Sequence, residues 1–298
     1  MSDMMTTHEV AAYLRIKERR IYELVRTQQI PFTRATGKLL FSRSLIDRWM
    51  AAGTARSSTA RTAAATAGRP PVIAGSRDPL LDWAARESGS GLAVIAGGSL
   101  DGLRRFVRGE ALVASLHLFD PPSGDWNAAW VRREAPDLPC VLVEFARREQ
   151  GLILPPANPL GLAKIADLIR KRARIVRRQS GAGARELLDH LLREACIDPE
   201  RPSYAEETAS TGQEVGQAVL DNRADTGLAT RAVARQFHLD FLPLATERFD
   251  LLVGRRDYFE PPFQKLFGFA RGEACRAKAK AMTGYDLSGL GTVRYNGP

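Results

Sequence analysis

Residues 51–69 constrain the fold of this chain more than any other stretch, because they cannot contribute to a folded core. They read AAGTARSSTARTAAATAGR, which contains no large apolar side chain. A segment of this composition predicts a soluble tether that is helical at most in part. We therefore divide the 298-residue chain into a small domain at residues 1–52, a linker at residues 53–69 and a large domain at residues 70–298.

The small domain carries the pattern of two short helices, a hairpin and a last helix. Thr7 is placed to cap a first helix whose apolar side chains recur at helical spacing, and residues 17–27 repeat that spacing. Pro31 ends the second helix, and residues 35–38 form a Gly-containing tip between two short strands. A last helix is expected at residues 44–50. This order predicts a winged helix-turn-helix.

Positive charge is concentrated in the small domain. The whole chain has a formal net charge of +9, and residues 15–48 contain nine Lys and Arg residues against three Asp and Glu residues. Such a local excess of basic side chains favours a nucleic-acid partner. The alternative is a protein-interaction module with a solvated basic face.

The order of these elements resembles the excisionase and MerR-like DNA-binding domains. The segments that carry the resemblance are residues 6–14, 20–25, 30–32 and 42–49. The resemblance implies that the second helix is the recognition helix and that the hairpin is a wing beside a phosphate or the minor groove. The DNA-binding side chains implied are Lys17, Arg19, Arg20 and Tyr22 on the recognition helix, and Arg34 and Lys38 on the wing.

After the linker, short apolar runs alternate with helical patterns. Strands are expected at residues 71–74, 91–96 and 111–117, and helices between them at residues 79–87 and 100–109. This alternation predicts βαβ units on a mainly parallel sheet, which is an α/β fold. Ligands of such sheets bind where strands run into helix N-termini.

Three strand-to-helix junctions of the large domain are chemically alike. They are Gly75-Ser76 before Asp78-Pro79, Gly97-Gly98-Ser99, and Ser180-Gly181-Ala182-Gly183. Each offers free backbone N–H groups beside a serine hydroxyl, with glycine where the chain must pass close to a bound group. If the three junctions converge, they form an anion site that needs no bound cation.

The large domain resembles the cytoplasmic PBP-like domain, which is related to the molybdate- and tungstate-binding proteins of ABC transporters and is often fused to a helix-turn-helix. The segments that carry the resemblance are residues 75–81, 97–103, 116–118, 150–159, 177–185, 224–228, 239–244, 247–251 and 283–286. It implies a type II periplasmic-binding-protein-like fold with two crossover strands. Lobe 1 would hold residues 70–150 and 245–298, and lobe 2 residues 151–244.

The same resemblance implies a ligand in the cleft between the lobes, with molybdate or tungstate as the expected oxyanion. The ligand-binding residues implied are Ser76, Ser99, Arg178, Ser180, Gly181, Asp225 and Thr226. The usual family phrase Gly-Ser-Gly-Thr-Arg has alanine here at Ala182 and Ala184, so two hydroxyl donors are missing. His117 ends an apolar strand, where a hydrogen-bonded core histidine is favoured over a ligand contact.

Other function classes are excluded by the absence of their patterns. No stretch approaches the roughly 20 consecutive apolar residues of a membrane span, and no secretory signal is present, so we expect a cytoplasmic protein. Hydrolase triad order, HExxH, Walker and Rossmann phrases are missing, so we expect no enzyme, no cofactor and no metal cation. Glu144, Glu149 and Asp167 fall where solvated faces are expected.

The sequence thus predicts a ligand-responsive, one-component transcription regulator. The small domain would bind DNA as a homodimer on two half-sites, and the large domain would sense the oxyanion. One alternative is a cytoplasmic adaptor that holds oxyanion for the assembly of a molybdenum or tungsten cofactor or enzyme. Another is a regulator that senses a small organic anion.

Overall fold

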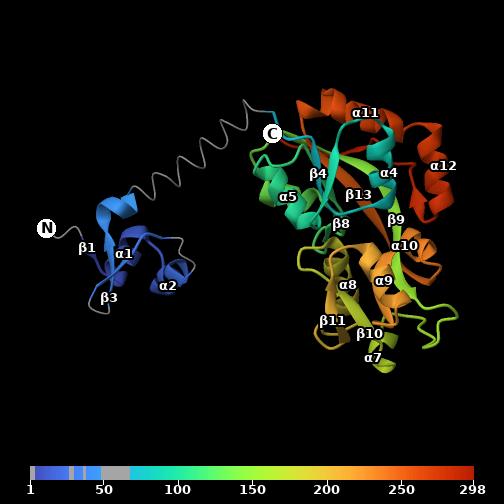
Figure 1. Cartoon of the computed structure of the whole chain (residues 1–298), viewed down its shortest axis with the longest axis horizontal. Helices are drawn as coiled ribbons and strands as arrows, with labels where there is room; N and C mark the ends of the chain where they lie inside the picture. Colours follow the sequence, from blue (N-terminus) through green and yellow to red (C-terminus); the bar gives the residue numbers. More distant parts are fainter. Residues whose placement is uncertain (1–3, 27–29, 36–37, 48–67) are drawn as a thin grey trace. The chain divides into compact units, whose positions relative to one another are not determined.

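The computed structural model describes residues 4–26, 30–35, 38–47 and 68–298. The chain forms two compact units, Met1–Gly68 and Arg69–Pro298 (Figure 1). The predicted linker lies outside the described residues except for its last two positions. No helix in the described part has both the length and the apolar character that crossing a membrane requires.

The first unit is a helix-turn-helix with a small antiparallel sheet of order β1-β3-β2. Its elements are β1 (Met4–Met5), α1 (Thr7–Leu14), α2 (Glu18–Arg26), β2 (Thr33–Ala35) and β3 (Lys38–Ser42), and residues 43–47 are helical. The predicted helices and hairpin are present, and the pairing of β1 with β3 was not predicted. The predicted last helix beyond residue 47 lies outside the described residues.

The turn between α1 and α2 is set by its caps. Thr6, rather than the predicted Thr7, is the N-cap: its hydroxyl accepts from the backbone N–H of Glu9 at 3.3 Å, and the Glu9 carboxylate accepts from the backbone N–H of Thr6 at 2.7 Å. This reciprocal capping box requires the glutamate three positions after the cap. Arg15 ends α1 in the left-handed conformation at φ 54°. The helices pack around a core of Val10, Ile21, Phe41 and Ile46.

One ten-stranded sheet runs through the second unit in the order β11-β10-β12-β9-β13-β6-β4-β5, with β14 and β15 also paired to β9. The strands are β4 (Val72–Gly75), β5 (Ala93–Ala96), β6 (Val113–Leu116), β9 (Cys140–Leu154), β10 (Arg174–Arg178), β11 (Ser203–Ala209), β12 (Thr226–Thr230), β13 (Asp240–Gly254), β14 (Tyr285–Asp286) and β15 (Val293–Asn296). A separate hairpin pairs β7 (Phe119–Asp120) with β8 (Asp125–Trp126).

The sheet is mixed rather than mainly parallel. Parallel pairing joins β4 to β5 and β6, and β10 to β11 and β12. The 15-residue strands β9 and β13 run antiparallel to each other and to their other neighbours. The prediction from the sequence underestimated antiparallel pairing. It assumed a crossover helix between strands, whereas the chain crosses between the lobes in β9 and β13, two long strands that pair with each other.

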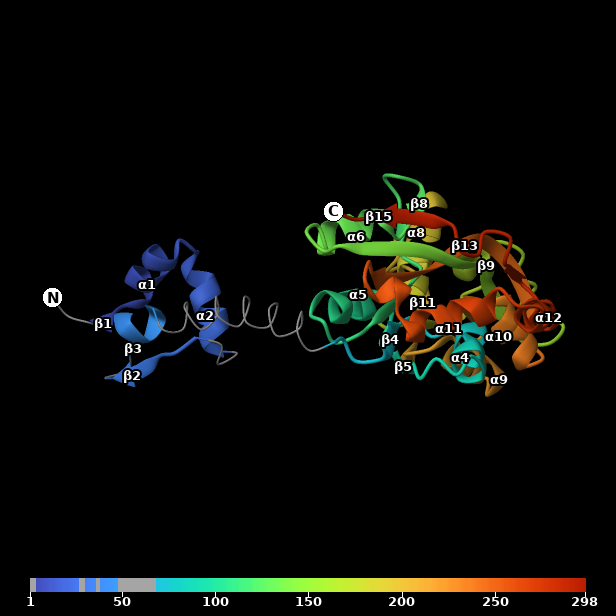
Figure 2. The same ribbon diagram turned by 90° about the horizontal axis from the view of Figure 1, so that it is seen from above.

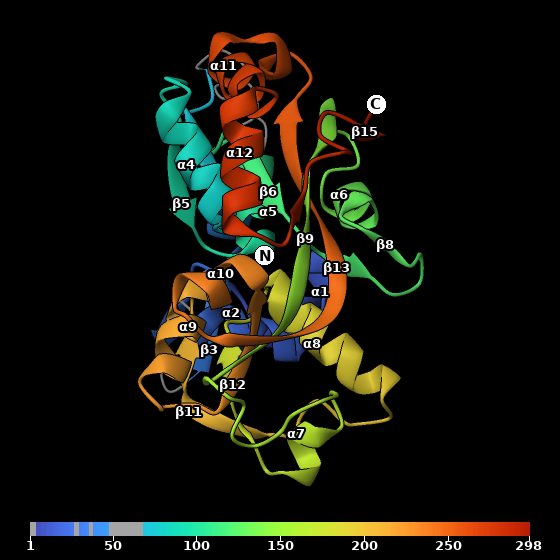
Figure 3. The same cartoon turned by 90° about the vertical axis from the view of Figure 1, so that its right-hand side faces the viewer.

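Strands β9 and β13 join two α/β lobes (Figure 3). One end of β13 pairs with β6 of lobe 1 through residues 250–253, and one end of β9 pairs with β12 of lobe 2 through residues 150–153. The helices are α4 (Pro79–Glu87), α5 (Ser99–Val107), α6 (Ala128–Glu134), α7 (Asp167–Arg170), α8 (Gly183–Glu194), α9 (Gly212–Leu220), α10 (Arg231–Gln236), α11 (Pro261–Ala270) and α12 (Glu273–Met282), with a 3-10 turn η1 (Asp257–Phe259). The predicted two-lobed fold is confirmed.

Each lobe has an apolar core on both faces of the sheet. In lobe 1, α11 and α12 pack with α4 over one face (Figure 2), and Phe106 of α5 joins Val131 of α6 on the other. In lobe 2, α8 covers one face with Leu187 and Leu188, while α9 and α10 cover the other. The C-terminal helices therefore complete lobe 1, although lobe 2 separates them from it in the sequence.

Candidate functional site

A small pocket lies where the two lobes meet the crossing strands. Its lining residues are Ser76, Arg77, Pro79 and His117 from lobe 1, Arg148 and Gln150 from β9, and Arg178, Gly212, Gln213, Thr230 and Val233 from lobe 2. The cavity has a volume of about 20 Å³. A water molecule needs roughly 10–15 Å³, so the lobes stand almost closed on this space.

Two helices begin at the pocket, and their caps explain the local sequence. At α4 the carboxylate of Asp78 accepts from the backbone N–H of Leu81 at 2.8 Å, and Pro79 occupies the first turn. At α9 the hydroxyl of Thr211 accepts from the backbone N–H of Glu214 at 3.1 Å. The positive ends of both helix dipoles therefore lie at the cavity, where they favour negative charge.

A buried group of charged and polar side chains forms one wall, and we call it the pocket cluster: Asp78, His117, Arg148, Gln150 and Glu247. Arg148 donates to Asp78 at 2.8 Å, pairs with Glu247 and lies 3.9 Å from the ring centre of Phe249. Gln150 Nε2 donates to Glu247 at 3.0 Å, and His117 Nδ1 lies 2.7 Å from the other Glu247 oxygen. Both carboxylates of the pocket cluster are thus held by protein donors.

The protonation states of the pocket cluster follow from its burial and its pairs. Burial would raise the pKa of Glu247, but the nearby Arg148 and His117 hold the pKa at about 2. Burial lowers the pKa of His117 despite the attraction of Glu247, so the ring is neutral near pH 7. The bond to Glu247 then assigns the ring proton to Nδ1 and leaves Nε2 as an acceptor.

Arg178 is the buried cation of the pocket that has no carboxylate partner. Its side chain is 8% exposed, and it donates to the carbonyl oxygens of Ala209 at 3.2 Å and Ser210 at 2.9 Å. Burial lowers the pKa of Arg178 to about 10, which leaves it charged near pH 7. Within the described residues no Asp or Glu side chain forms an ion pair with Arg178. A buried charge of this kind is stabilised by an anion.

Three further atoms of the pocket lining lack hydrogen-bond partners within the described residues. They are Arg148 Nε, Gln150 Oε1 and Thr230 Oγ1, and all three are buried. Buried polar atoms in folded proteins almost always have a partner, so an unpaired group is a reason to look for one from outside the chain. Here three unpaired atoms and one unpaired charge share a single pocket.

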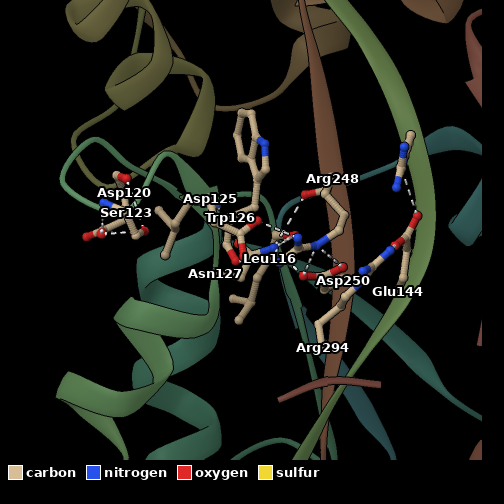
Figure 4. Close-up of polar contacts among 12 residues, drawn as sticks. Leu116, Asp120, Ser123, Asp125, Trp126, Asn127, Glu144, Arg248, Asp250 and Arg294 are labelled. Atoms are coloured by element: carbon tan, nitrogen blue, oxygen red, sulfur yellow. Dashed lines mark hydrogen bonds and ion pairs between the residues drawn. The ribbon is translucent and has the colours of Figure 1, made fainter. Parts of the chain in front are cut away.

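A second polar cluster lies around the crossing strand β13: Asn127, Arg248 and Asp250 are buried, Asp125 is exposed, and no buried atom of the four lacks a partner. We call it the wall cluster: Asp125, Asn127, Arg248 and Asp250 (Figure 4). Arg248 donates to Asp250 at 3.0 Å, to Asp125 at 2.5 Å and to the carbonyl oxygen of Trp126 at 2.6 Å. Asn127 donates to Asp250 at 2.8 Å and accepts from the backbone N–H of Leu118 at 2.6 Å.

Of the sequence-predicted ligand residues, Ser76 and Arg178 line the pocket. Ser99 is buried behind it, where its hydroxyl accepts from the backbone N–H of His117 at 3.2 Å. His117 is the hydrogen-bonded buried histidine that the sequence favoured, and it also lines the cavity.

The predicted junction at residues 180–183 is a contact between the lobes rather than part of the pocket lining. The carbonyl oxygen of Gly181 accepts from the backbone N–H of Leu100 at 3.2 Å, and Gln179 Nε2 donates to the carbonyl oxygen of Gly97 at 2.9 Å. A Cβ on Gly183 would lie 2.3 Å from the carbonyl oxygen of His117. Ser180 is exposed. Two of the three predicted junctions therefore pack against each other.

Asp225 and Thr226 are not brought to the pocket. They lie at the start of β12, whereas Thr230 at its end lines the cavity. Thr226 donates to the carbonyl oxygen of Ile153 at 2.9 Å, and the Asp225 carboxylate accepts from the backbone N–H of Arg174 at 2.7 Å. Their assignment as ligand residues has no support from this pocket and stays a prediction.

The sequence reading missed Arg148, Gln150, Thr230 and Glu247. For Arg148 and Gln150 a signal was present in the strand CVLVEFARREQGLIL, where polar residues interrupt a buried apolar run. The predicted solvated faces were also wrong for Glu144 and Asp167, which are buried. Arg294 and Arg147 bind the Glu144 carboxylate at 2.7 and 3.2 Å (Figure 4), and backbone N–H groups bind that of Asp167.

The predicted DNA-binding side chains of the first unit are exposed where the structure describes them. These are Lys17, Arg19, Arg20 and Tyr22, at the start of α2 or just before it. Tyr22 is 54% exposed, and Arg20 forms an ion pair with Glu23 at 2.6 Å. Arg34 and Lys38 lie on β2 and β3, and their side chains fall outside the described part.

Two family models match the chain. Residues 4–54 match a helix-turn-helix domain, and residues 81–271 match the PBP superfamily domain. The resemblances drawn from the sequence are confirmed by these matches, both in kind and in order along the chain.

Comparison with known proteins extends these matches. YvgK of Bacillus subtilis (strain 168), an uncharacterized protein, is 25% identical over 97% of this chain and 96% of its own length. A putative phosphate ABC transporter substrate-binding protein with bound phosphate from Clostridium perfringens has a TM-score of 0.53 at 12% identity, covering 71% of this chain and 96% of that chain. A tungstate ABC transporter structure from Geobacter sulfurreducens has a TM-score of 0.50 at 14% identity, covering 70% and 97%. At such identities the likeness shows the fold alone.

Proposed function

Since this chain belongs to the PBP superfamily and carries a helix-turn-helix domain at its N-terminus, we propose that it is a ligand-responsive, one-component transcription regulator. The first unit binds DNA, and the pocket between the lobes binds a small oxyanion. The protein acts in the cytoplasm as a homodimer and needs no cofactor. Arg178 carries the ligand half of this proposal, because it is a buried cation that lacks a carboxylate partner.

Several donors around Arg178 support an oxyanion in the same space. The Nε atom of Arg148 and the hydroxyl of Thr230 are unpaired donors, and α4 and α9 begin at the cavity. Hydrogen bonds to a charged partner contribute about 1.5–3 kcal/mol each, so a few of them give useful affinity. Molybdate and tungstate are the candidates from the sequence resemblance, and phosphate is a third from the similar fold with bound phosphate.

The switch follows from the position of the pocket. Since residues of both lobes line it, a bound oxyanion contacts both and favours the closed arrangement of the lobes. A ligand shifts such an equilibrium only by its difference in affinity for the two states. In the dimer, closure changes the spacing of the two DNA-binding units and hence the fit to two half-sites.

The ligand half is tested by calorimetric titration of the full chain with molybdate, tungstate, sulfate, phosphate and small organic acids. Saturable binding of an oxyanion is expected. Binding of organic acids alone would support the sensor of a small organic anion. Silence toward every member of the panel would overturn the proposed ligand class.

The DNA half is tested by gel retardation at several salt concentrations. Phosphate contacts make binding fall steeply with salt, and loss of one contact reduces the slope by about one. We expect that reduction for Lys17→Ala and for Arg19→Ala, and no change for the control Arg193→Ala, which removes an exposed side chain of α8. Oxyanion binding without any DNA binding would favour an adaptor for cofactor or enzyme assembly.

A further inference from the structure

The pocket offers an acceptor as well as donors, and this limits which oxyanion fits. We propose that the ligand is an oxyanion that keeps a proton near neutral pH, and that Gln150 selects it by accepting that proton in a hydrogen bond. This inference rests on the proposed function of the pocket. It ranks phosphate and arsenate above molybdate, tungstate and sulfate, which carry no proton at neutral pH.

The orientation of the Gln150 amide is fixed by its neighbour. Its Nε2 donates to Glu247 at 3.0 Å, and the reversed amide would set a carbonyl oxygen against a carboxylate oxygen. Gln150 Oε1 is therefore the free end of the amide, and it is buried without a partner in the described part of the chain. It can accept a hydrogen bond, and it cannot donate one.

The acceptor lies next to donors for the same ligand. Gln150 on β9 pairs in register with Thr230 on β12, so the two side chains are neighbours on one face of the sheet. Thr230 Oγ1 is likewise buried and unpaired. Arg178 and Arg148 supply charged donors to the same cavity. A ligand that satisfies this set must accept several hydrogen bonds and donate at least one.

A fully deprotonated oxyanion meets this set poorly. All of its oxygens are acceptors, so one of its lone pairs faces Gln150 Oε1, or that oxygen stays buried without a partner. An oxyanion that pairs with this buried acceptor should bind about tenfold more tightly than one that leaves it unpaired. An oxyanion with one O–H group donates that proton to Gln150 and accepts from the other groups.

The charges around the cavity favour the same choice. Arg148 is balanced by Asp78 and Glu247, and Arg77 pairs with Asp82 at 2.6 Å. Together with Arg178 these two arginines give three positive charges, and the three carboxylates give three negative charges. His117 is uncharged and leaves this balance unchanged. A pocket without surplus positive charge favours the less negative, protonated form of an oxyanion.

The first test is calorimetry on the full chain near neutral pH. Phosphate and arsenate are expected to bind at least about tenfold more tightly than sulfate, molybdate and tungstate. Equal or tighter binding of the unprotonated anions would overturn the inference and leave the proposed oxyanion sensor standing. If none of the five anions binds, the proposed oxyanion site fails together with this inference, and the DNA-binding half of the proposal is tested separately.

The second test removes the acceptor. Gln150→Met is expected to lower phosphate affinity by about tenfold and to leave molybdate affinity unchanged or raised. The preference for phosphate over molybdate should therefore decrease. The matched control is Gln217→Met on α9, whose exposed amide donates to Asp221, and it should leave both affinities unchanged. An equal loss for all five anions would assign Gln150 a purely structural role. If Gln150→Met does not fold, the anion panel on the unaltered chain decides.

Discussion

Consecutive residues of β13 belong to two buried clusters that differ in one respect. Glu247 is part of the pocket cluster, and Arg248 is part of the wall cluster on the opposite face, as the alternation of a strand requires. Both clusters pair a buried arginine with at least one buried carboxylate. In the wall cluster every buried side-chain oxygen and nitrogen has a partner, whereas the pocket lining retains three buried atoms without one.

The difference separates a structural role from a binding role. A polar cluster that satisfies its own hydrogen bonds fixes the local structure, and one that retains free donors and acceptors can bind a further group. Residue type and charge do not distinguish the two clusters, because both consist of arginine, carboxylate and amide side chains. They differ in the number of buried hydrogen-bond donors and acceptors that have no partner.

The largest effect is expected from Arg248→Met in the wall cluster. Asp250 would lose its buried cation, so the free energy of unfolding should fall by about 3 kcal/mol. Denaturant titration measures this change, with Arg104→Met on the exposed face of α5 as the control. Oxyanion affinity of the folded variant should stay unchanged. A variant of full stability would show that the wall cluster contributes little to the fold.

The next effect is expected from Arg178→Met in the pocket. Loss of the buried cation should weaken oxyanion binding by about a hundredfold, which is about 2.7 kcal/mol. The free energy of unfolding should change far less than in Arg248→Met, since Arg178 has no carboxylate to leave unpaired. Arg174→Met is the control, because it lies on the same strand but is exposed and pairs with Asp225. Unchanged affinity in Arg178→Met would remove the main support for an anion site.

A pH effect is expected from Asp250. Burial raises its pKa to about 6, against the opposing attraction of Arg248 and the bond from Asn127. Between pH 4 and 6 the unfolded chain loses this proton first, so the unfolding free energy falls as pH rises through that window. In Asp250→Asn that dependence is absent. From pH 4 to pH 7 the unfolding free energy of the unaltered chain should therefore fall by about 1–3 kcal/mol relative to that of the variant. Parallel stability curves would contradict the raised pKa.

The smallest effect comes from a matched pair of substitutions at the two ends of β12. Thr230→Val removes an unpaired hydroxyl, so the unliganded protein should become more stable by about 1 kcal/mol while oxyanion binding weakens. Thr226→Val removes a hydroxyl that donates to Ile153, so it should destabilise by about 1 kcal/mol and leave affinity unchanged. Thermal unfolding with and without oxyanion measures both. The same sign of change in both variants would contradict the different roles of the two hydroxyls.

Elements with local signals were predictable from the sequence. Helix α4 has its predicted bounds because Asp78 and Pro79 together specify a helix start. The pocket residues on β9 were not predictable in this way. Whether Arg148 and Gln150 face solvent or a cavity depends on which strands flank β9, and those partners come from residues more than 70 positions later in the chain. The place of Thr230 likewise depends on the direction in which β12 enters the sheet.

The contact between Gly183 and His117 has a consequence for the closure of the two lobes. The start of α8 in lobe 2 rests against the backbone that follows β6 in lobe 1, with no space for a side chain at residue 183. A side chain at this position would therefore hold the lobes apart at that point. Under the proposed function, it would weaken oxyanion binding without touching the ligand.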